Sequence, residues 1–400
     1  MISVHEALET VLRNIVTLGS EYVGLNDAHG RILREELRAD TDLPPFDRAR
    51  MDGYAVRSAD VETAPVTLKV VGEVAAGATF DQQVEAGTAV KIFTGAPMPT
   101  GADAVQQVEL TRASDGRVTI ERPVTPGQFV TVRASEVSAG DIVAESGIEI
   151  GAAEMAVLAS FGYSTVNVGA RPHVVVLSTG SELVEVSTKP AGAQIRNSNS
   201  YTLSSYARRD GAEVRGLGIV KDDPDTTREA LLKAAKQADV VVTSGGVSMG
   251  DYDLVEAALK DLGAEVFFDR VAIRPGKPTV FARLDSTYFF CLPGNPVSTS
   301  VTYNVFVRPA LRKMQGDCKP LLPTVRTELM RPLKDSSDRR SYLPARTSIE
   351  SGKAGSLPLK WGGSSDFVAF MRANSLIVVP EDVHSIDEGE TVSCLLLAQI

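Results

Sequence analysis

Three short loops rich in glycine, serine and proline follow apolar runs in the middle of the sequence. The first reads Ser-Thr-Gly-Ser-Glu (178–182), the second begins Ser-Gly-Gly (244–246), and the third reads Pro-Gly-Asn-Pro (293–296). Glycine lets a backbone approach a phosphate closely, and a helix that starts after such a loop offers free N–H groups. Each loop alone is equally compatible with an ordinary strand-to-helix turn, but together they predict a cradle for an anionic ligand. Its candidate residues are Ser178, Thr179, Gly180, Ser181, Ser244, Gly245, Gly246, Ser248, Pro293, Gly294, Asn295 and Pro296.

Acidic residues cluster close to these loops. Asp222, Asp223 and Asp225 follow the apolar stretch Gly-Leu-Gly-Ile-Val, and Asp251 and Asp253 lie just beyond the second loop. Carboxylates from two neighbouring loops are able to hold Mg²⁺ through water beside substrate phosphates. Acidic turns are common, so a plain solvated turn is an equal alternative on this evidence.

A basic segment brings Arg270, Arg274 and Lys277 together, and Pro275 and Pro278 stiffen its backbone. Guanidinium groups on a rigid backbone suit phosphates and other oxyanions. The alternative is a solvated surface segment. Surface charge alone does not require two prolines, so the pattern favours a binding role.

Composition and missing motifs exclude several classes of protein. The 41 Lys and Arg residues against 51 Asp and Glu give a net charge of −10, which disfavours wrapping nucleic acid or lying on anionic lipid. Neither G-x-x-x-x-G-K-[ST] nor G-x-G-x-x-G occurs, so ordinary nucleotide hydrolases and dinucleotide dehydrogenases lose support. No apolar run approaches the ~20 residues of a membrane span. The scattered cysteines Cys291, Cys318 and Cys394 predict a reducing, cytoplasmic setting.

The order of elements indicates how these residues are positioned. Ser3 and Glu6 form a capping-box signature at the start of an amphipathic N-terminal helix. Residues 40–145 alternate in short runs broken by Gly, Pro and Asp, which predicts a small β unit. Residues 171–315 alternate apolar runs with helical patterns, which predicts a mostly parallel sheet covered by helices on both faces. The remaining residues return to a strand pattern.

Two stretches of the β unit contain candidate functional residues. Residues 51–56 read Met-Asp-Gly-Tyr-Ala-Val, and residues 94–105 are too rich in small residues and prolines for an ordinary surface turn. An aspartate next to Gly-Tyr is more often a turn cap than a catalytic group. Its role therefore stays open on these grounds alone.

Seven motifs, taken in order, resemble those of the molybdopterin molybdenumtransferase (MoeA) family, to which the gephyrin E domain also belongs. The resemblance runs from about residue 3 to the C-terminus, and nothing is left over for a fused adenylyltransferase domain. Motifs this rare do not line up in one order by chance. They are PPFDRARMDGYAVR (44–57), IFTGAPMPTGADAV (92–105), LSTGSEL (177–183), IRNSNSYTL (195–203), TSGGVSMGDYD (243–253), IRPGKP (273–278) and LPGNPVS (292–298).

The resemblance implies a multidomain α/β plus β fold in an elongated, four-part subunit that forms a homodimer. A three-layer α/β molybdopterin-binding domain with a mostly parallel sheet is expected beside a β-rich inserted domain, a connector domain and a C-terminal β-barrel-like domain. The expected boundaries are 1–19 for an N-terminal helix docking on the α/β domain, 20–39 and 141–169 for the connector, 40–140 for the β-rich domain, 170–317 for the α/β domain and 318–400 for the C-terminal domain.

The resemblance also implies a reaction: insertion of molybdate into adenylylated molybdopterin, with Mg²⁺-dependent release of AMP. A molybdopterin adenylyltransferase is the expected partner that supplies the substrate. Matched motif by motif, the catalytic residues are expected to be Asp52, Thr94, Glu182, Asp222 and Asp253, with the metal held by Asp222, Asp253 and Glu182.

Further substrate contacts are expected from the cradle and from Arg270, Arg274, Lys277, Arg340 and Ser364. The last two match family residues near the molybdate. The family often has lysine where this chain has Arg270 and Arg274, a change that keeps the charge but alters the donor geometry.

The residue chemistry agrees with this reaction. A polyanionic phosphoanhydride, a tetrahedral dianion and a divalent cation need a basic rim beside carboxylates. No Ser/His/Asp or Cys/His set offers a nucleophile, so positioning and charge neutralisation are the expected catalytic devices. One alternative is an adenylyltransferase that joins ATP to molybdopterin, which leaves the flanking β units without a purpose. The other is a non-catalytic scaffold, which has no need of the acidic set.

Overall fold

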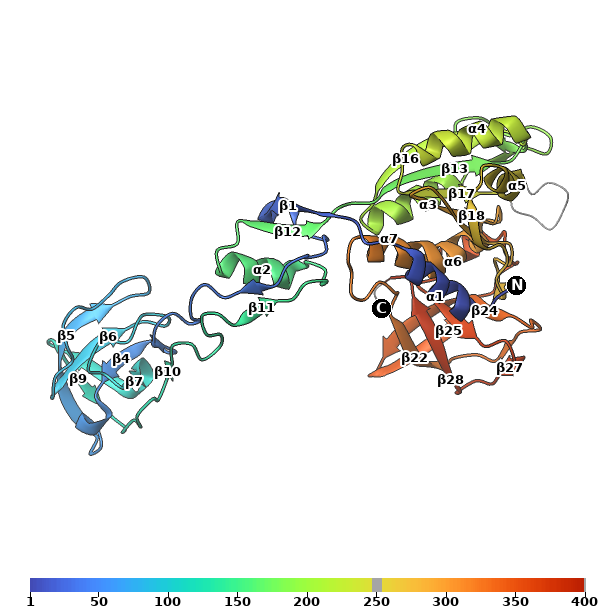
Figure 1. Cartoon of the computed structure of the whole chain (residues 1–400). Helices are drawn as coiled ribbons and strands as arrows, with labels where there is room; N and C mark the ends of the chain where they lie inside the picture. The colour runs from blue at the N-terminus through green and yellow to red at the C-terminus, as the bar shows by residue number, and fades with distance from the viewer. Residues whose placement is uncertain (247–253, 399–400) are drawn as a thin grey trace. The chain divides into compact units, whose positions relative to one another are not determined.

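The computed structural model describes residues 1–246 and 254–398, and the chain folds into two compact units (Figure 1). The second unit is an insertion within the first, because the chain leaves the first unit and later returns to it. The first unit comprises Met1–Glu35, Ser146–Gly151 and Thr165–Ile400, and the second comprises Glu36–Glu145 and Ala152–Ser164.

A six-stranded sheet lies at the centre of the first unit, in the order β16-β13-β17-β21-β20-β18. Strands β16, β13, β17 and β21 run parallel to one another. Strand β20 runs antiparallel to both of its neighbours, a reversal that no sequence pattern indicated. The strands are β13 (His173–Thr179), β16 (Glu213–Val220), β17 (Val240–Ser244), β18 (Glu265–Phe268), β20 (Val280–Leu284) and β21 (Thr287–Leu292).

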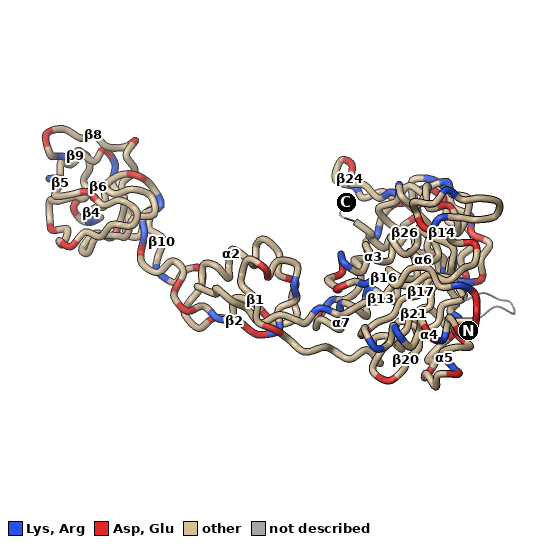
Figure 2. Tube along the Cα trace, turned by 90° about the horizontal axis from the view of Figure 1, so that it is seen from above, with Lys and Arg blue, Asp and Glu red and all other residues tan. Residues whose placement is uncertain are grey.

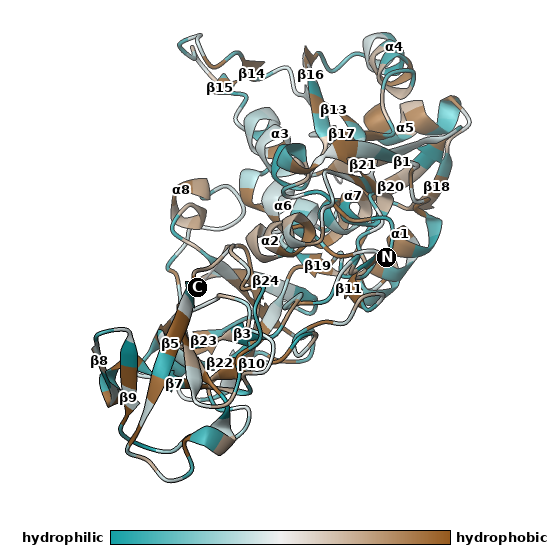
Figure 3. Cartoon of the chain, turned by 90° about the vertical axis from the view of Figure 1, so that its left-hand side faces the viewer, coloured by the Kyte–Doolittle hydropathy of each residue, from teal (hydrophilic) through white to brown (hydrophobic). Residues whose placement is uncertain are grey.

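Buried apolar residues, brown in Figure 3, fill the central strands of this sheet. Val174 and Val176 belong to one buried core cluster, and Val175 and Leu177 belong to another. Successive side chains of a strand point to opposite faces. A continuous apolar run therefore fits a strand that is covered on both sides.

Helices cover the two faces of the sheet (Figure 1). Helices α1, α3, α6 and α7 share the core cluster of Val174, whereas α4 and α5 share that of Val175. The capping box of α1 is present, since Ser3 Oγ accepts from the Glu6 N–H and Glu6 Oε2 accepts from the Ser3 N–H. The helices are α1 (Val4–Asn14), α3 (Asn199–Arg209), α4 (Pro224–Ala235), α5 (Leu254–Asp261), α6 (Pro296–Thr302) and α7 (Arg308–Met314), with a π-helical turn (Tyr303–Val307) between the last two.

The C-terminal part of the first unit is a closed ring of five strands in the order β24-β25-β22-β28-β26, which β26 closes by pairing with β24. Closure leaves this sheet without open edges. Strand β19, which lies between β18 and β20 in the chain, pairs with β24 and connects the ring to the α/β part. The elements are β19 (Ile273–Arg274), β22 (Thr324–Leu329), β23 (Leu333–Lys334), β24 (Arg340–Glu350), β25 (Lys353–Pro358), α8 (Phe367–Phe370), β26 (Ser375–Val379), β27 (Ser385–Ile386) and β28 (Thr391–Leu396).

Two small strand pairs complete the first unit. Antiparallel strands β1 and β12 pair near the points where the chain leaves and re-enters it. Parallel strands β14 and β15 pair in the segment that joins β13 to α3. Their bounds are β1 (Ser20–Gly24), β12 (Thr165–Gly169), β14 (Leu183–Val184) and β15 (Ile195–Arg196), and a 3-10 turn (Leu25–Asp27) follows β1.

The second unit is built on another six-stranded sheet, in the order β7-β4-β6-β5-β9-β8. Two apolar clusters pack on it, one around Leu68 and one around Ile92. The elements are β2 (Leu37–Arg38), β3 (Arg48–Ala49), β4 (Gly53–Val56), β5 (Val66–Val74), β6 (Thr88–Ile92), β7 (Ala104–Gln107), β8 (Thr111–Ser114), β9 (Arg117–Ile120), β10 (Val130–Thr131), β11 (Ile142–Ala144) and α2 (Ala152–Ser160), with 3-10 turns at Ser58–Asp60 and Val108–Leu110.

Charged side chains of both signs are spread along both units rather than gathered in one block (Figure 2). Among the helices that the structure describes, none combines the length and the apolar character needed to cross a bilayer.

Candidate active site

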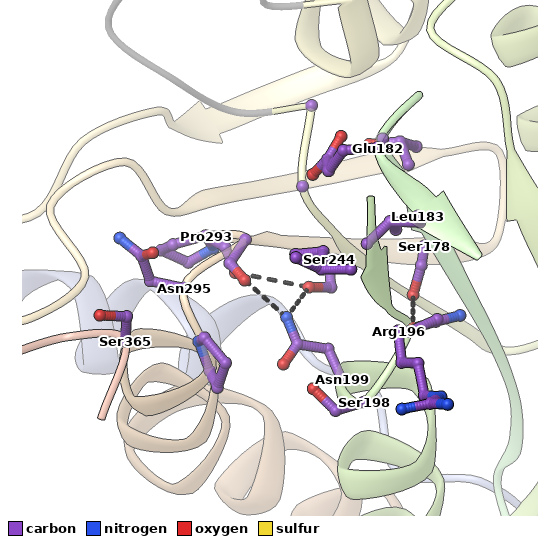
Figure 4. A pocket seen from close by; sticks show the side chains of 18 of the residues that line it. Ser178, Glu182, Leu183, Arg196, Ser198, Asn199, Ser244, Pro293, Asn295 and Ser365 are labelled. Atoms are coloured by element: carbon purple, nitrogen blue, oxygen red, sulfur yellow. Dashed lines mark hydrogen bonds between the residues drawn. The ribbon is translucent and has the colours of Figure 1, made fainter. Parts of the chain in front are cut away.

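A cavity of about 1040 Å³ opens at the carboxyl ends of β13, β17 and β21 (Figure 4). Strand β13 lies between β16 and β17, so the chain first moves to one side of β13 and then crosses back to the other. Ligands of open α/β sheets bind outside strand ends at such a switch point. The sequence candidates that line the cavity are Ser178, Thr179, Gly180, Glu182, Asp222, Ser244, Gly245, Gly246, Pro293, Gly294, Asn295 and Pro296.

A group of buried, hydrogen-bonded Ser and Asn side chains lies at the base of the cavity (Figure 4). Asn199 Nδ2 donates to Ser244 Oγ and to the Gly294 carbonyl oxygen, both at 2.7 Å. Ser178 Oγ donates to Asn197 Oδ1 at 3.0 Å. None of these four side-chain residues is more than 9% exposed. The network therefore ties the loops after β13, β17 and β21 to the start of α3.

Asn197 and Asn199 lie in the motif IRNSNSYTL, but neither was named as a site residue from the sequence. Asn197 precedes α3 and Asn199 is its first residue, and Asn close to the start of an amphipathic helix is a recognisable signal. What they contact depends on strand ends far away in the chain. The other lining residues that were not predicted are Leu183, Val186, Pro190, Gln194, Ile195, Arg196, Ser198, Pro278, Ser365 and Phe367.

The glycine pair after β17 packs against the end of β13. Gly245 has a φ of 91°, and a Cβ at this position would lie 2.3 Å from the Thr179 carbonyl oxygen. Gly246 has a φ of 67°, and its Cβ would lie 2.5 Å from Val255 Cγ2. Only glycine combines this backbone conformation with so close an approach. The pair is thus required by the packing of the loop itself.

Several backbone N–H groups of the loops are already hydrogen-bonded within the protein. The Gly180 N–H donates to a carbonyl oxygen at the end of β16, and the Gly245 N–H donates to one at the end of β21. The Ser181 N–H donates to Asp222 Oδ2 at 2.7 Å. Each of these N–H groups has one hydrogen to donate. An anion in the cavity cannot use them without breaking existing bonds.

Glu182 and Asp222 are the carboxylates that line the described part of the cavity. The neighbouring Asp223 has a structural role, since its Oδ2 accepts from the Thr226 N–H at 2.8 Å and caps α4. Hydrogen bonds from Thr226 lower the pKa of Asp223 because they favour its charged form. The acidic stretch is therefore divided between a helix cap and the cavity.

The donor set of the cavity fits Mg²⁺ in part. This ion is usually held by one or two carboxylates together with water and substrate phosphates, and Glu182 and Asp222 supply such oxygens. Within residues 1–246 and 254–398, no three His, Cys, Asp or Glu side chains are grouped so that they could hold a metal ion together. The candidates Ser248 and Asp253 lie outside the described residues, and so does Asp251.

The basic segment lies against the C-terminal ring. Arg274 Nη1 is ion-paired with Asp335 Oδ1, and the Asp335 side chain is only 3% exposed. Arg270, Arg274 and Lys277 are not among the residues that line the described cavity, to which this segment contributes Pro278. The pairing of Arg274 is a contact that its position in the sequence did not indicate.

The C-terminal ring approaches the cavity through the loop before α8. The Ser364 carbonyl oxygen accepts from the Val297 N–H at 2.9 Å, at the start of α6. Phe367, the first residue of α8, lines the cavity. Arg340 is instead ion-paired with Glu381, with 3.3 Å between Nε and Oε2.

The second unit holds Asp52 and Thr94 in direct contact. Asp52 Oδ1 accepts from the Thr94 N–H at 2.7 Å and from the Thr94 hydroxyl at 2.8 Å. These bonds lower the pKa of Asp52. A Cβ at Gly53 would lie 1.9 Å from the Gln106 carbonyl oxygen, which explains the glycine after Asp52. This unit has a separate cavity of about 390 Å³ lined by Pro45, Phe46, Asp47, Pro97, Met98, Pro99, Thr100, Gly101, Ala102 and Arg133.

A mostly parallel sheet with a cavity at its switch point, a closed β ring and an inserted β unit define a multidomain α/β ligand-binding protein. Three family models match successive parts of the chain. They are the MoeA N-terminal region (domain I and II) at 2–162, the probable molybdopterin binding domain at 175–313 and the MoeA C-terminal region (domain IV) at 326–397.

Relatives and solved structures match over nearly the whole chain. Molybdopterin molybdenumtransferases from Staphylococcus aureus (strain MSSA476) and Staphylococcus epidermidis are 33% and 32% identical, over 99% of this chain and 95% of each relative. The crystal structure of the molybdopterin biosynthesis MoeA protein from Pyrococcus horikoshii OT3 has a TM-score of 0.85 and 30% identity, over 99% of this chain and 100% of that one. The chain belongs to the MoeA family. The predicted family, the transferase class and the place in molybdenum-cofactor synthesis are confirmed, together with a multidomain fold that has an α/β domain and a closed barrel.

Proposed function

We propose that this chain inserts molybdate into adenylylated molybdopterin and releases AMP in a Mg²⁺-dependent step. The observation that carries the proposal is the cavity at the strand ends, where Glu182 and Asp222 lie beside buried Asn and Ser side chains. The full-length relatives are molybdopterin molybdenumtransferases, which supports the same reaction.

The chain's own contribution in this proposal is positioning and charge. Glu182 and Asp222, with Asp253, hold the Mg²⁺ ion, which supplies neutralising charge at the phosphoanhydride when it is bound. The Ser181 N–H fixes one oxygen of Asp222 and leaves the other for the metal or its water. The two dithiolene sulfurs bond to molybdenum while one oxygen of molybdate leaves as water with the two thiol protons, and a second water molecule cleaves the phosphoanhydride to release AMP. No protein nucleophile is required. The rate acceleration then comes mainly from the orientation of the two bound reactants.

Two structural expectations complete the proposal. The chain divides into an N-terminal helix with the α/β domain (1–19 and 170–317), a connector (20–39 and 141–169), a β-rich domain (40–140) and a C-terminal domain (318–400). Two copies form a homodimer in which Asp52 and Thr94 of each copy complete the site of the other. Isologous pairing of this kind is the commonest form of oligomer. The sedimentation mass at micromolar concentration tests the dimer, and a single-chain mass with intact activity contradicts it.

The cysteine pattern supports a cytoplasmic location. A molybdopterin adenylyltransferase is the proposed partner that supplies the substrate. The basic segment and the pair Arg340 and Ser364 remain proposed substrate contacts. For Arg274 this requires that the ion pair with Asp335 be exchanged or shared.

The decisive experiment incubates the purified chain with adenylylated molybdopterin, Mg²⁺ and molybdate. AMP release is followed by chromatography, and active cofactor by reconstitution of a molybdenum-free molybdoenzyme. We expect AMP release that depends on molybdate. Consumption of ATP with free molybdopterin identifies an adenylyltransferase instead. Binding of the substrate without any AMP release identifies a non-catalytic scaffold.

A further inference from the structure

The cavity has an unbalanced charge for an anionic ligand. Glu182 and Asp222 contribute two carboxylates to its lining, and Arg196 is the single cationic residue among the lining residues that the structure describes. A substrate with a phosphoanhydride adds further negative charge. A Mg²⁺ ion held by the carboxylates offsets part of this charge, and a cationic side chain close to the phosphate adds to binding.

Several other donors near the strand ends are committed elsewhere. Arg274 is paired with the buried Asp335 and lies outside the described lining. The N–H groups of Gly180, Ser181 and Gly245 are bonded within the protein. The uncharged hydroxyls of Thr179 and Ser198 also line the cavity and are not hydrogen-bonded within the described protein, so Arg196 is the lining group that adds opposite charge.

Arg196 has the geometry of a phosphate ligand. It ends strand β15, whose partner β14 follows the Glu182 loop, and Figure 4 shows it on the same side of the cavity as Ser178. Its Nε donates to the Thr188 carbonyl oxygen at 3.1 Å, which orients the guanidinium group. No ion pair joins Arg196 to a carboxylate in the described part of the chain. The two terminal nitrogens are left to bind two oxygens of one phosphate.

We propose that Arg196 binds the phosphate of the nucleotide-bearing substrate and keeps it bound when AMP is the remaining product. This inference rests on the proposed function, because it assigns the contact within the same cavity. Arg196 was not among the residues expected from the sequence. It adds a cationic contact inside the cavity to those proposed for the basic segment, whose Arg270, Arg274 and Lys277 do not line the described cavity.

The test compares AMP with adenosine, which differ only in the phosphate. Dissociation constants of both are measured by titration calorimetry for the wild-type chain, Arg196→Gln and Arg196→Lys, with the full-length protein. We expect Arg196→Gln to weaken AMP binding by about 10-fold or more and to leave adenosine binding unchanged, since a charge-assisted contact is lost. Arg196→Lys should weaken AMP binding less than Arg196→Gln does. Lysine keeps the positive charge and lacks only the paired terminal nitrogens of the guanidinium group.

Lys189→Gln is the matched control. Lys189 lies in the same segment between β14 and β15, carries the same charge and does not line the cavity. Its removal should leave the ratio of AMP to adenosine affinity unchanged. The inference is overturned if Arg196→Gln weakens both ligands equally, if Lys189→Gln has the same effect, or if the wild-type chain binds AMP no better than adenosine. Molybdate-dependent AMP release by wild-type protein in those cases leaves the proposed function standing without Arg196.

Discussion

The cavity of the first unit and the Asp52–Thr94 pair of the second are built in opposite ways. Asn199 and Ser244 are buried and hold three loops together through shared hydrogen bonds. Asp52 and Thr94 are exposed and bond mainly to each other. Loss of a buried polar partner leaves other groups unsatisfied, whereas exposed side chains are removed at little cost in stability. Stability and activity should therefore be coupled at the cavity base and separable at the exposed pair.

The largest expected effects are on turnover. Asp222→Asn and Asp52→Asn should each reduce the rate by roughly 10²-fold or more, a size typical for loss of one charged catalytic group. Asp222→Asn should recover at high Mg²⁺, because mass action compensates for weaker metal binding. Asp52→Asn should not recover, since we assign Asp52 to the substrate or to water. The measurement is AMP release across a Mg²⁺ series.

Circular dichroism of each variant is the folding control, because Asn keeps the size of Asp and one acceptor oxygen. Asp223→Asn serves as the matched variant for Asp222→Asn, since Asp223 caps α4 and does not line the cavity. An identical response of Asp222→Asn and Asp52→Asn to Mg²⁺ refutes the division between metal-holding and substrate-acting carboxylates.

The next effect concerns stability. Asn199→Ala removes one buried and one partly buried hydrogen bond and should lower the free energy of unfolding of the first unit by about 2–3 kcal/mol. Ser198→Ala is the neighbouring control, because no hydrogen bond of the Ser198 hydroxyl is seen in the described part of the chain. Thr94→Ala should leave the unfolding transition of its unit almost unchanged. Urea denaturation followed by fluorescence and circular dichroism measures the free energy of unfolding of all three variants. Equal losses for Asn199→Ala and Thr94→Ala contradict the expected difference between the two sites.

A smaller effect is expected at the basic segment. Arg274→Ala leaves the buried Asp335 carboxylate without its cation and should cost about 1–2 kcal/mol of stability, a figure reduced because the arginine is partly exposed. Arg274→Lys should reduce the stability less than Arg274→Ala does, because lysine keeps the positive charge. The double variant Arg274→Ala with Asp335→Asn should recover part of the loss. If Arg274→Ala weakens AMP binding at unchanged stability, the segment contacts the substrate directly.

The smallest effect is a shift in pH dependence. Hydrogen bonds from Thr94 lower the pKa of Asp52, so the carboxylate stays charged to lower pH than an unperturbed aspartate. Any stability from this contact is present above the unfolded pKa and is lost as the pH falls through the lowered folded pKa. Thr94→Val removes the hydroxyl donor and should raise the pKa of Asp52 toward its usual range.

Carbon NMR titration of Asp52 reads this shift directly, and the acidic limb of the rate profile should move to higher pH with it. Thr94→Ser retains a hydroxyl and should titrate like the wild type. An unchanged pKa in Thr94→Val shows that the backbone N–H alone maintains the charged form.

Much of the fold was predictable because strong local patterns agree with it. The apolar run 173–178 became β13, and the Ser3 and Glu6 signature became the cap of α1. The reversed strand β20 was not predictable, since a short buried strand has the same apolar pattern in either direction. The choice depends on which neighbour it pairs with, and β21 follows it through a tight turn.

The amino-acid sequence by itself determined which residue types follow each strand, which loops need glycine and to which family the chain belongs. These properties are local, or they rest on the order of motifs along the chain. Only the tertiary structure decided that Asn199 joins Ser244 to Gly294, that Arg274 pairs with Asp335, and that the Gly180 N–H is already bonded. Such partners are chosen by strand order and register across the fold, and the same side chains in another packing would have had different ones.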